Sequence, residues 1–224
     1  MFSPLTLKPL TLITGHYGVG KTNLTINLAL DLREAGQTVT VVDLDIVNPY
    51  FRSSDYTTLL EDAGIEIIAP LFAGTTLDTP TLSAALGGVF EREGYVLVDA
   101  GGDDVGATAL GRYRAQIKAR DYDLLYVVNA NRNLTQTADE AIEVLREIEA
   151  VCGLCASGIA NNTHLQTETT CATIEKGEPF GEQCAQQAEL PLVCVTVPEG
   201  LECKELTTPE DKRYPTKTFV KPPW

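Results

Sequence analysis

Residues 15–22 form a glycine-rich segment that is suited to binding phosphate. They read Gly-His-Tyr-Gly-Val-Gly-Lys-Thr and fit the pattern G-x-x-x-x-G-K-[ST]. Glycines let a backbone wrap closely around phosphates, so that amide N–H groups point inward. Lys21 is expected to neutralise charge on the β- and γ-phosphates, and the Thr22 hydroxyl to be a magnesium ligand. The residues expected to contact a nucleotide here are Gly15, His16, Tyr17, Gly18, Val19, Gly20, Lys21, Thr22 and Asn23.

Aspartates follow two of the apolar runs. Asp43 and Asp45 end one run, and Asp99 ends another and is followed by Gly101-Gly102. Ligands of open α/β sheets bind at the carboxyl ends of strands, so both clusters should face the glycine-rich segment. Asp99 fits the carboxylate that holds magnesium. Gly102 allows a backbone amide to approach the terminal phosphate. Asp43 and Asp45 alternate onto one side of the strand, and either is suited to polarising an attacking water. A turn or helix cap is the competing interpretation for each aspartate.

Apolar runs and helical patterns alternate along the chain, and these elements must position the residues above. Strands are predicted at 10–14, 38–43, 65–69, 95–99, 123–129, 154–161 and 192–197. Helices are predicted at 21–35, 56–63, 81–93, 107–120, 135–152 and 167–190, the last with a break near 177–179. The competing interpretation of residues 15–22 is a glycine-rich turn that binds no ligand. The predicted strand before residue 15 and the predicted helix from Lys21 disfavour this interpretation. The alternation implies a mostly parallel sheet covered on both faces.

We therefore expect an α/β P-loop fold over residues 1–206, a three-layer α/β/α sandwich with a roughly seven-stranded sheet. Residues 207–224 contain four prolines and no helical period. They are predicted to be an extended tail, either loose or packed on a neighbouring subunit through Phe219 and Trp224.

Composition narrows the classes of function. The chain has 224 residues and a formal net charge of −14, and it lacks the basic footprint that nucleic-acid binders usually show, which disfavours nucleic acid as a partner and leaves only a local basic patch open. The same acidity disfavours an anionic membrane surface, and no apolar run reaches the roughly 20 residues of a membrane helix. A cytoplasmic protein with mostly reduced thiols is expected. The Cys152–Cys155 pair is either a metal or cluster site or, as we favour, ordinary apolar packing.

Three segments, taken with their spacing, resemble the MinD/ParA/CobQ branch of P-loop NTPases, which also holds nitrogenase iron protein and dethiobiotin synthetase. They are GVGKT at 18–22, VVDLDIVNP at 41–49 and VLVDAGG at 96–102, and the resemblance covers about residues 10–201. GHYGVGKT, DLDIVNPYFR and GGDDVGATALGR are together similar to a bacterial group within this branch. The resemblance implies ATP and Mg²⁺ as ligands, with Lys21 and Asp45 catalytic and Asp45 positioning the attacking water. It also implies Thr22, Asp45 and Asp99 as the magnesium site.

The same resemblance places the nucleotide base beside Asn161 and Asn162 and beside Pro198 in VTVPEG, residues 195–200. GTPases of related folds read guanine with Asn-Lys-x-Asp. Residues 161–164 read Asn-Asn-Thr-His instead, so we expect ATP rather than GTP.

His16 departs from the branch, which usually carries a lysine at this position that reaches the nucleotide of a dimer partner. A free imidazole is mostly neutral at pH 7, so partial substitution for that lysine and simple packing beside the loop both stay open. Arg52 and Arg112 are weaker candidates for contacting phosphate.

Two classes of function follow. The first is a Mg²⁺-dependent ATPase that works as a nucleotide-driven switch on a protein partner, with a possible nucleotide-dependent homodimer. The alternative is an ATP-dependent ligase or phosphotransferase acting on a small carboxylate, with Thr75, Thr76 and Thr79 of the loop at 70–80 lining its pocket. Spatial organisation on DNA or a membrane fits the charge worst.

Overall fold

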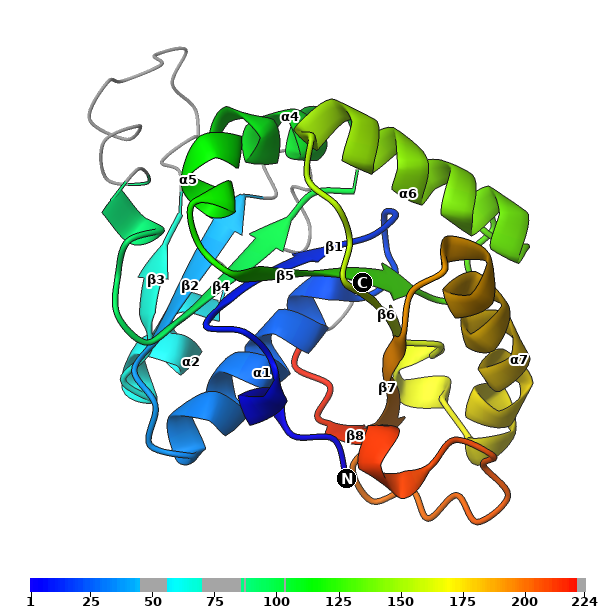
Figure 1. The fold of residues 1–224 in the computed structure, drawn as a ribbon. Coiled ribbons are helices and arrows are strands. Elements are labelled where there is room, and N and C mark those ends of the chain that lie inside the picture. The colour runs from blue at the N-terminus through cyan, green and yellow to red at the C-terminus, as the bar shows by residue number, and fades with distance from the viewer. Residues whose placement is uncertain (45–55, 70–85, 87, 103, 221–224) are drawn as a thin grey trace.

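The fold is built on one parallel sheet. The computed structural model describes residues 1–44, 56–69, 86, 88–102 and 104–220 (Figure 1). Within these ranges eight strands follow the order β3-β2-β4-β1-β5-β6-β7-β8, and all their pairings are parallel. The strands are β1 (Leu10–Thr14), β2 (Val39–Leu44), β3 (Glu66–Ile68), β4 (Tyr95–Ala100), β5 (Tyr122–Val128), β6 (Gly158–Asn161), β7 (Leu192–Pro198) and β8 (Arg213–Thr216).

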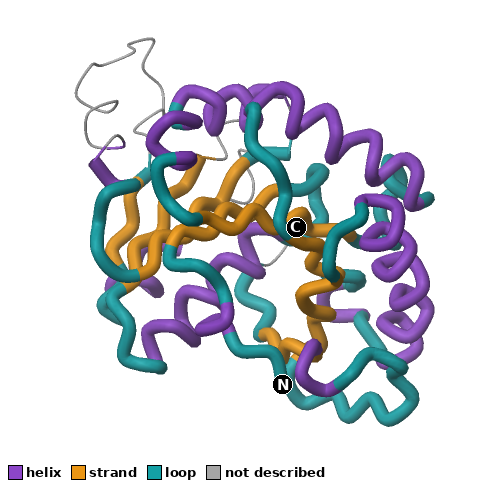
Figure 2. The backbone as a smooth tube through the Cα atoms, in the orientation of Figure 1, coloured by secondary structure: helices purple, strands orange, loops and turns teal. Residues whose placement is uncertain are grey.

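Helices cover both faces of this sheet (Figures 1 and 2). One face packs against α1 (Lys21–Glu34) and α2 (Thr57–Asp62). The other packs against α4 (Asp104–Arg112), α5 (Arg114–Lys118), α6 (Ala138–Cys152) and α7 (Cys171–Ala188). Short 3-10 helices lie at Pro4–Thr6, Gln166–Glu168 and Glu210–Lys212. The predicted three-layer α/β/α sandwich is confirmed, with eight described strands against roughly seven expected.

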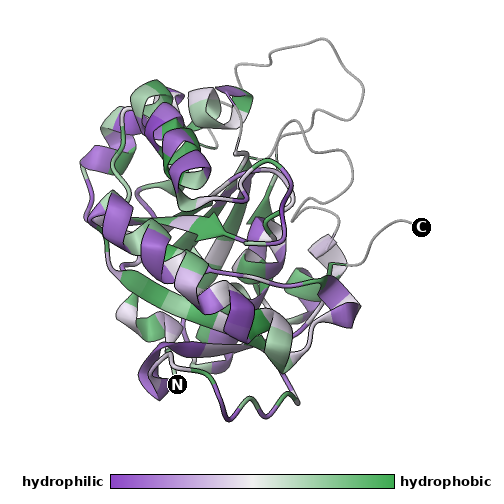
Figure 3. Cartoon of the chain, turned by 90° about the vertical axis from the view of Figure 1, so that its right-hand side faces the viewer, coloured by the Kyte–Doolittle hydropathy of each residue, from purple (hydrophilic) through white to green (hydrophobic). Residues whose placement is uncertain are grey.

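Burial on both faces explains why the strands read as continuous apolar runs. Every residue of β1 and β2 is buried, as a parallel sheet between two helical layers requires. The strands are mostly hydrophobic, whereas the outer faces of the helices are hydrophilic (Figure 3). Strand β1 lies at the centre, where Leu12 pairs with Val98 of β4 and Leu124 of β5. The end of β1 is therefore fixed from both sides.

Two helix predictions were wrong in detail. The helix expected at 107–120 is divided at Tyr113 into α4 and α5. The break expected near 177–179 does not occur, and α7 runs through Pro179. Gly177 and Gly181 pack so closely against Thr163 and Asn161 that an added Cβ would lie within 2.8 Å of those side chains. This packing against the end of β6 accounts for the continuity of α7 despite the lost backbone hydrogen bond at the proline.

The segment after residue 206 contains strand β8, which pairs with β7 at the edge of the sheet. Phe219 packs, partly buried, against the core on the α1 face of its own chain, and Trp224 lies outside the described residues. Glu178 of α7 anchors the start of this segment. It is 3% exposed and accepts hydrogen bonds from the backbone N–H and hydroxyl groups of Thr207 and Thr208, at 2.5–3.2 Å.

Replacement of Glu178 by alanine is expected to lower the free energy of unfolding by about 3 kcal/mol, because the buried donors of Thr208 and the part-buried donors of Thr207 lose their acceptor. Urea denaturation measures this, with exposed Glu182→Ala on the same helix as the control. Burial raises the pKa of Glu178, but the hydrogen bonds outweigh it and leave this pKa below its usual value. The stabilisation is therefore complete above about pH 4.5 and is lost as the pH falls through the folded-state pKa. Equal stability of the two variants at neutral pH would contradict this role.

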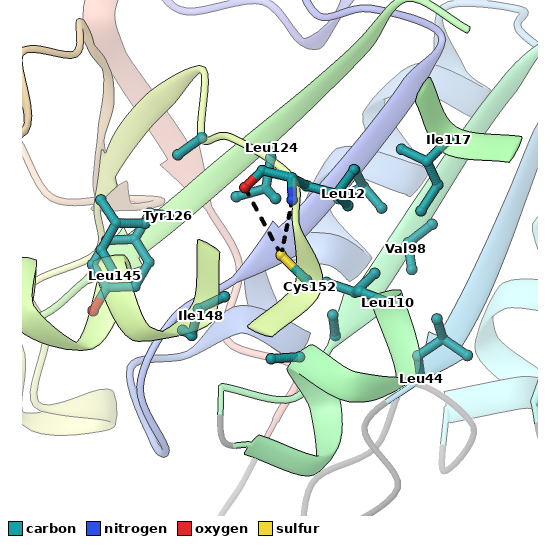
Figure 4. Packing of buried hydrophobic residues seen from close by; sticks show 14 of the residues in the cluster. Leu12, Leu44, Val98, Leu110, Ile117, Leu124, Tyr126, Leu145, Ile148 and Cys152 are labelled. Carbon is teal, nitrogen blue, oxygen red and sulfur yellow. Dashed lines mark hydrogen bonds between the residues drawn. The ribbon is translucent and has the colours of Figure 1, made fainter. Parts of the chain in front are cut away.

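The cysteines are mostly free thiols, as expected. Cys152, Cys155, Cys184 and Cys194 are free, whereas Cys171 and Cys203 form a disulfide that joins the start of α7 to the segment after β7. Cys152 packs among Leu12, Leu110 and Leu124 and hydrogen-bonds the backbone of Leu154 (Figure 4).

Burial raises the pKa of the Cys152 thiol, whereas Cys155 is exposed. The two sulfurs therefore have different surroundings, and the described residues include no cluster of three metal-binding side chains. No helix in the described ranges is long and apolar enough to cross a membrane.

Candidate functional site

The glycine-rich segment joins the end of β1 to the first turn of α1. Gly20 is the N-cap residue of α1 and has a φ of 92°, which favours glycine. There is also no space for a side chain, because a Cβ on Gly20 would overlap the Asn162 amide and approach His164. The loop therefore presses its backbone against the residues that follow β6, and it places the N–H groups of the helix start toward any bound anion.

Lys21 and Thr22 lie on the first turn of α1 and are almost buried. Lys21 is 5% exposed, and its Nζ donates to the His16 carbonyl oxygen at 3.4 Å. The Thr22 hydroxyl donates to Asp99 Oδ2 at 2.7 Å. Asp99 is the next-to-last residue of β4 and is fully buried, and the sheet register places it beside Asp43 of β2. The glycine-rich segment and the aspartate of the 96–102 segment, which were expected to lie together, are thus joined by the hydrogen bond between Thr22 and Asp99.

The chemistry of this oxygen pair fits a magnesium ion. Mg²⁺ prefers hard oxygen ligands and is commonly held by one or two carboxylates together with phosphate oxygens. Thr22 Oγ1 and Asp99 Oδ2 are oxygen atoms of this kind, and they lie 2.7 Å apart. Asp45, the third predicted ligand, lies outside the described residues, as do Arg52, Asp103 and the loop at 70–80.

Gly102 brings the segment after β4 into contact with the glycine-rich segment at residues 15–22, which is called the phosphate loop below. A Cβ at this position would overlap the carbonyl group of Gly15, so only glycine fits. One residue earlier, the Gly101 carbonyl accepts a hydrogen bond from Thr14 Oγ1 at 3.4 Å. A backbone shift after Asp99 would therefore change these contacts with Thr14 and Gly15 directly.

A pocket with a cavity volume of about 400 Å³ lies beside the phosphate loop, in the size range of small-molecule sites. Five parts of the chain line it: the loop with the start of α1, the segments after β5 and β6, the end of β7, and the segment from the end of β8. The lining residues are Tyr17, Gly18, Gly20, Lys21, Thr22, Asn23, Asn131, Arg132, Asn162, His164, Leu165, Gln166, Thr169, Thr196, Pro198, Thr216, Thr218 and Val220.

The charge of this pocket is opposite to that of the chain. Its lining includes the cations Lys21 and Arg132 and no carboxylate. The Arg132 guanidinium packs against Gly18, and its Nε is buried without a hydrogen-bond partner among the described residues. Burial lowers the pKa of Arg132, as expected for a cation that is partly removed from water. None of the ion pairs between described residues involves Arg132 or Lys21. An anionic ligand would therefore be stabilised here.

His164 contributes a neutral side chain to the same wall. Burial and then the positive charge of Arg132 lower the pKa of His164 to about 4. Its Nδ1 accepts a hydrogen bond from the Gln166 N–H at 3.0 Å, which places the proton on Nε2. Neither His164 nor Arg132 is among the predicted site residues. Neither residue has a sequence signal, because both lie on loops that only the fold brings to the phosphate loop.

Asn161 and Asn162, which were expected to contact the nucleotide base, form hydrogen bonds with other residues of the chain. Asn162 Nδ2 donates to the Val19 carbonyl at 2.7 Å, and Asn162 Oδ1 accepts from the Thr196 hydroxyl at 2.6 Å. Asn161 is fully buried, donates to the Gly177 carbonyl and accepts from Thr163. In this structure Asn162 lines the pocket while holding the phosphate loop, whereas Asn161 fastens α7.

The other predicted residues divide between the pocket and its surroundings. Tyr17, Asn23 and Pro198 line the pocket. His16 is not among the lining residues, and its Nδ1 lies 3.3 Å from the Tyr17 carbonyl oxygen. Arg112 is exposed at the end of α4.

Comparison with known proteins agrees with this geometry. Residues 10–180 match the family model described as the CobQ/CobB/MinD/ParA nucleotide binding domain. No curated protein matches the chain.

Similar folds occur in solved structures. The signal recognition particle receptor FtsY from Elizabethkingia anophelis, in complex with GDP, is 17% identical, with a TM-score of 0.58 over 92% of this chain and 61% of that one. The signal recognition particle 54 kDa protein from Aeropyrum pernix K1, also with GDP, is 18% identical, with a TM-score of 0.58 over 86% and 43%. A nucleotide-binding protein from Archaeoglobus fulgidus, with ADP, is 15% identical, with a TM-score of 0.52 over 84% and 81%. The chain thus spans less than two thirds of the first two proteins.

Proposed function

The chain belongs to the CobQ/CobB/MinD/ParA family of nucleotide-binding domains, and on that premise we propose that it is a Mg²⁺-dependent ATPase that acts as a nucleotide-driven switch on a protein partner. The observation that carries this proposal is the pocket beside the phosphate loop. In a chain with a net charge of −14, its lining has two cations and no carboxylate. That charge distribution favours a polyanion, and the loop and helix N-terminus are suited to phosphates.

The roles of the residues follow from their positions. Lys21 donates to phosphate oxygens from the first turn of α1, and Arg132 adds positive charge beside Gly18. Thr22 and Asp99 would hold Mg²⁺, which neutralises charge on the phosphates when it is bound. Gly102 lies against Gly15, where a change at the terminal phosphate can be passed to the segment after β4.

Calorimetric titration tests the ligand. We expect Mg·ATP to bind with micromolar or higher affinity and GTP to bind more weakly, since residues 161–164 lack the Asn-Lys-x-Asp guanine signature. The absence of binding by both nucleotides would overturn the proposed function. Tighter binding of GTP than of ATP would identify GTP as the ligand, and the proposed phosphate site would still stand.

Asp45→Ala is expected to retain ATP affinity and to lower the hydrolysis rate about 100-fold, because Asp45 is predicted to orient the attacking water. Phosphate release under saturating Mg·ATP measures the rate. Asp62→Ala, which removes an exposed carboxylate from the end of α2, is the matched control. Equal turnover of the Asp45 variant and the wild type would remove this residue from the mechanism.

The same variant discriminates between the switch and a ligase or phosphotransferase. Size-exclusion chromatography of the Asp45→Ala protein with and without ATP should reveal a nucleotide-dependent dimer, and ATP should increase capture of a protein partner. An unchanged species that turns over rapidly only with a small carboxylate would favour the enzyme instead. A cytoplasmic location stays a prediction.

A further inference from the structure

The C-terminal segment, residues 213–220, is attached to the helix that follows the phosphate loop. In Figure 1 it leaves β8 and runs back beside α1. Asn27 Nδ2 donates to the Lys217 carbonyl at 2.9 Å, and Asn27 Oδ1 accepts from the Lys217 N–H at 2.7 Å. Asn23 Nδ2 donates to the same carbonyl at 3.0 Å, and Asn23 Oδ1 accepts from the N–H groups of Phe219 and Val220 at 2.8 and 3.2 Å. Five hydrogen bonds therefore hold residues 217–220.

A third side chain of α1 extends this attachment. Asp31 accepts a hydrogen bond from the hydroxyl of the buried Tyr214 at 2.8 Å. Asn23, Asn27 and Asp31 are spaced four residues apart, so they form one polar stripe along α1. Beside the stripe, Phe219 and Val220 pack against the core on this face of the sheet. The C-terminal segment is thus docked by both polar and apolar contacts.

Docking on the stripe makes the C-terminal segment a wall of the pocket. Thr216 lies beside Pro198 in the β7–β8 register, and Thr216, Thr218 and Val220 all line the cavity together with Lys21 and Thr22. The segment lies beyond residues 10–180, which match the family model. The family match therefore does not cover this wall of the pocket.

We propose that residues 216–220 bind the nucleoside part of the nucleotide and that this binding is linked to docking on Asn23 and Asn27. The inference rests on the proposed nucleotide binding. Phosphates are expected at the loop and its two cations, whereas threonine hydroxyls are neutral and both donate and accept hydrogen bonds, as ribose and base atoms do. Asn23 follows Thr22 directly. A nucleotide that orders the start of α1 should therefore also stabilise the docked C-terminal segment, and docking should in turn strengthen nucleotide binding.

Thr218→Val tests the contact without touching the five hydrogen bonds. Thr218 is exposed in the pocket, and valine keeps its shape while removing the hydroxyl. We expect the Kd for ATP to rise about fivefold, because one hydrogen bond to the nucleoside is lost, whereas the Kd for tripolyphosphate should not change. Thr58→Val, on the exposed face of α2, is the control for this substitution. An unchanged Kd for ATP, or an equal rise for tripolyphosphate, would overturn the inference.

Hydrogen exchange tests the linkage in the wild-type chain. ATP should slow exchange of the Lys217, Phe219 and Val220 amides, which donate to Asn27 and Asn23. Asn27→Ala should abolish this protection and raise the Kd for ATP about tenfold. Thermal melting is used to confirm that the variant is folded. Exchange at these amides that does not respond to ATP would refute the linkage. The failure of both experiments while wild-type protein still binds Mg·ATP would reject this inference and leave the proposed function standing.

Discussion

Replacement of Lys21 by alanine is expected to raise the Kd for ATP at least about 100-fold and to abolish hydrolysis. Removing a charged partner from a nearly buried site costs about 3–5 kcal/mol, and each 1.4 kcal/mol is a factor of ten in affinity. Lys21 is 5% exposed, lies at the start of α1 and lines the pocket. Arg132 remains in the variant, but it packs beside Gly18 and does not belong to the first turn of α1, so it is not expected to replace the lost donor.

The Lys21 variant is expected to stay folded, because alanine favours the helix and the lost hydrogen bond to the His16 carbonyl is long, at 3.4 Å. Calorimetry with ATP measures the affinity, and a thermal melt checks the fold. Lys118→Ala, at the exposed end of α5, controls for the loss of one positive charge. If the Lys21 variant bound ATP as the wild type does, the glycine-rich segment would no longer be identified as the phosphate site.

Asp99→Asn is expected to lower Mg²⁺-dependent turnover by about 100-fold or more while the fold is kept. The substitution keeps the shape of a fully buried side chain and still offers an oxygen to the Thr22 hydroxyl, but it removes the charge that would hold the metal. The effect should depend on the metal. Mg²⁺ should strengthen ATP binding by the wild type and change binding by the variant much less.

ATP titrations in EDTA and in excess Mg²⁺ make this comparison directly. Asp62→Asn, an exposed carboxylate on α2, is the matched control. Equal strengthening by Mg²⁺ in the Asp99 variant and the wild type would exclude Asp99 as a metal ligand. It would also leave the hydrogen bond with Thr22 as a purely structural contact.

Most of the fold was predictable because a parallel sheet between two helical layers produces long apolar runs. β1, β2 and β4 were placed to within one residue for this reason. Proline and glycine rules predicted a break in α7, but the contacts of Gly177 and Gly181 with the end of β6 are tertiary and invisible to those rules. Strand β8 was missed since proline-rich segments lack a strand signal.

The site was predictable only where its residues are close in sequence. Lys21 and Thr22 belong to one motif, and their meeting with Asp99 follows from the rule that parallel strands end at one edge. Arg132 and Thr218 line the same pocket, but they come from loops more than 80 residues apart that only the completed sheet brings together. The pairing of Cys171 with Cys203 likewise depends on the fold, because spacing alone does not determine connectivity.

The docking of the C-terminal segment on α1 also has a consequence for synthesis on the ribosome. Asn27 and Lys217 are 190 residues apart. At about 5–20 residues per second, roughly 10–40 s pass between the translation of the two. During that interval the polar stripe of α1 has no partner from its own chain, and the nucleotide pocket lacks one wall. Nucleotide therefore cannot gain its full set of proposed contacts on a nascent chain, and the full stabilisation it gives comes only after β8 has joined the sheet.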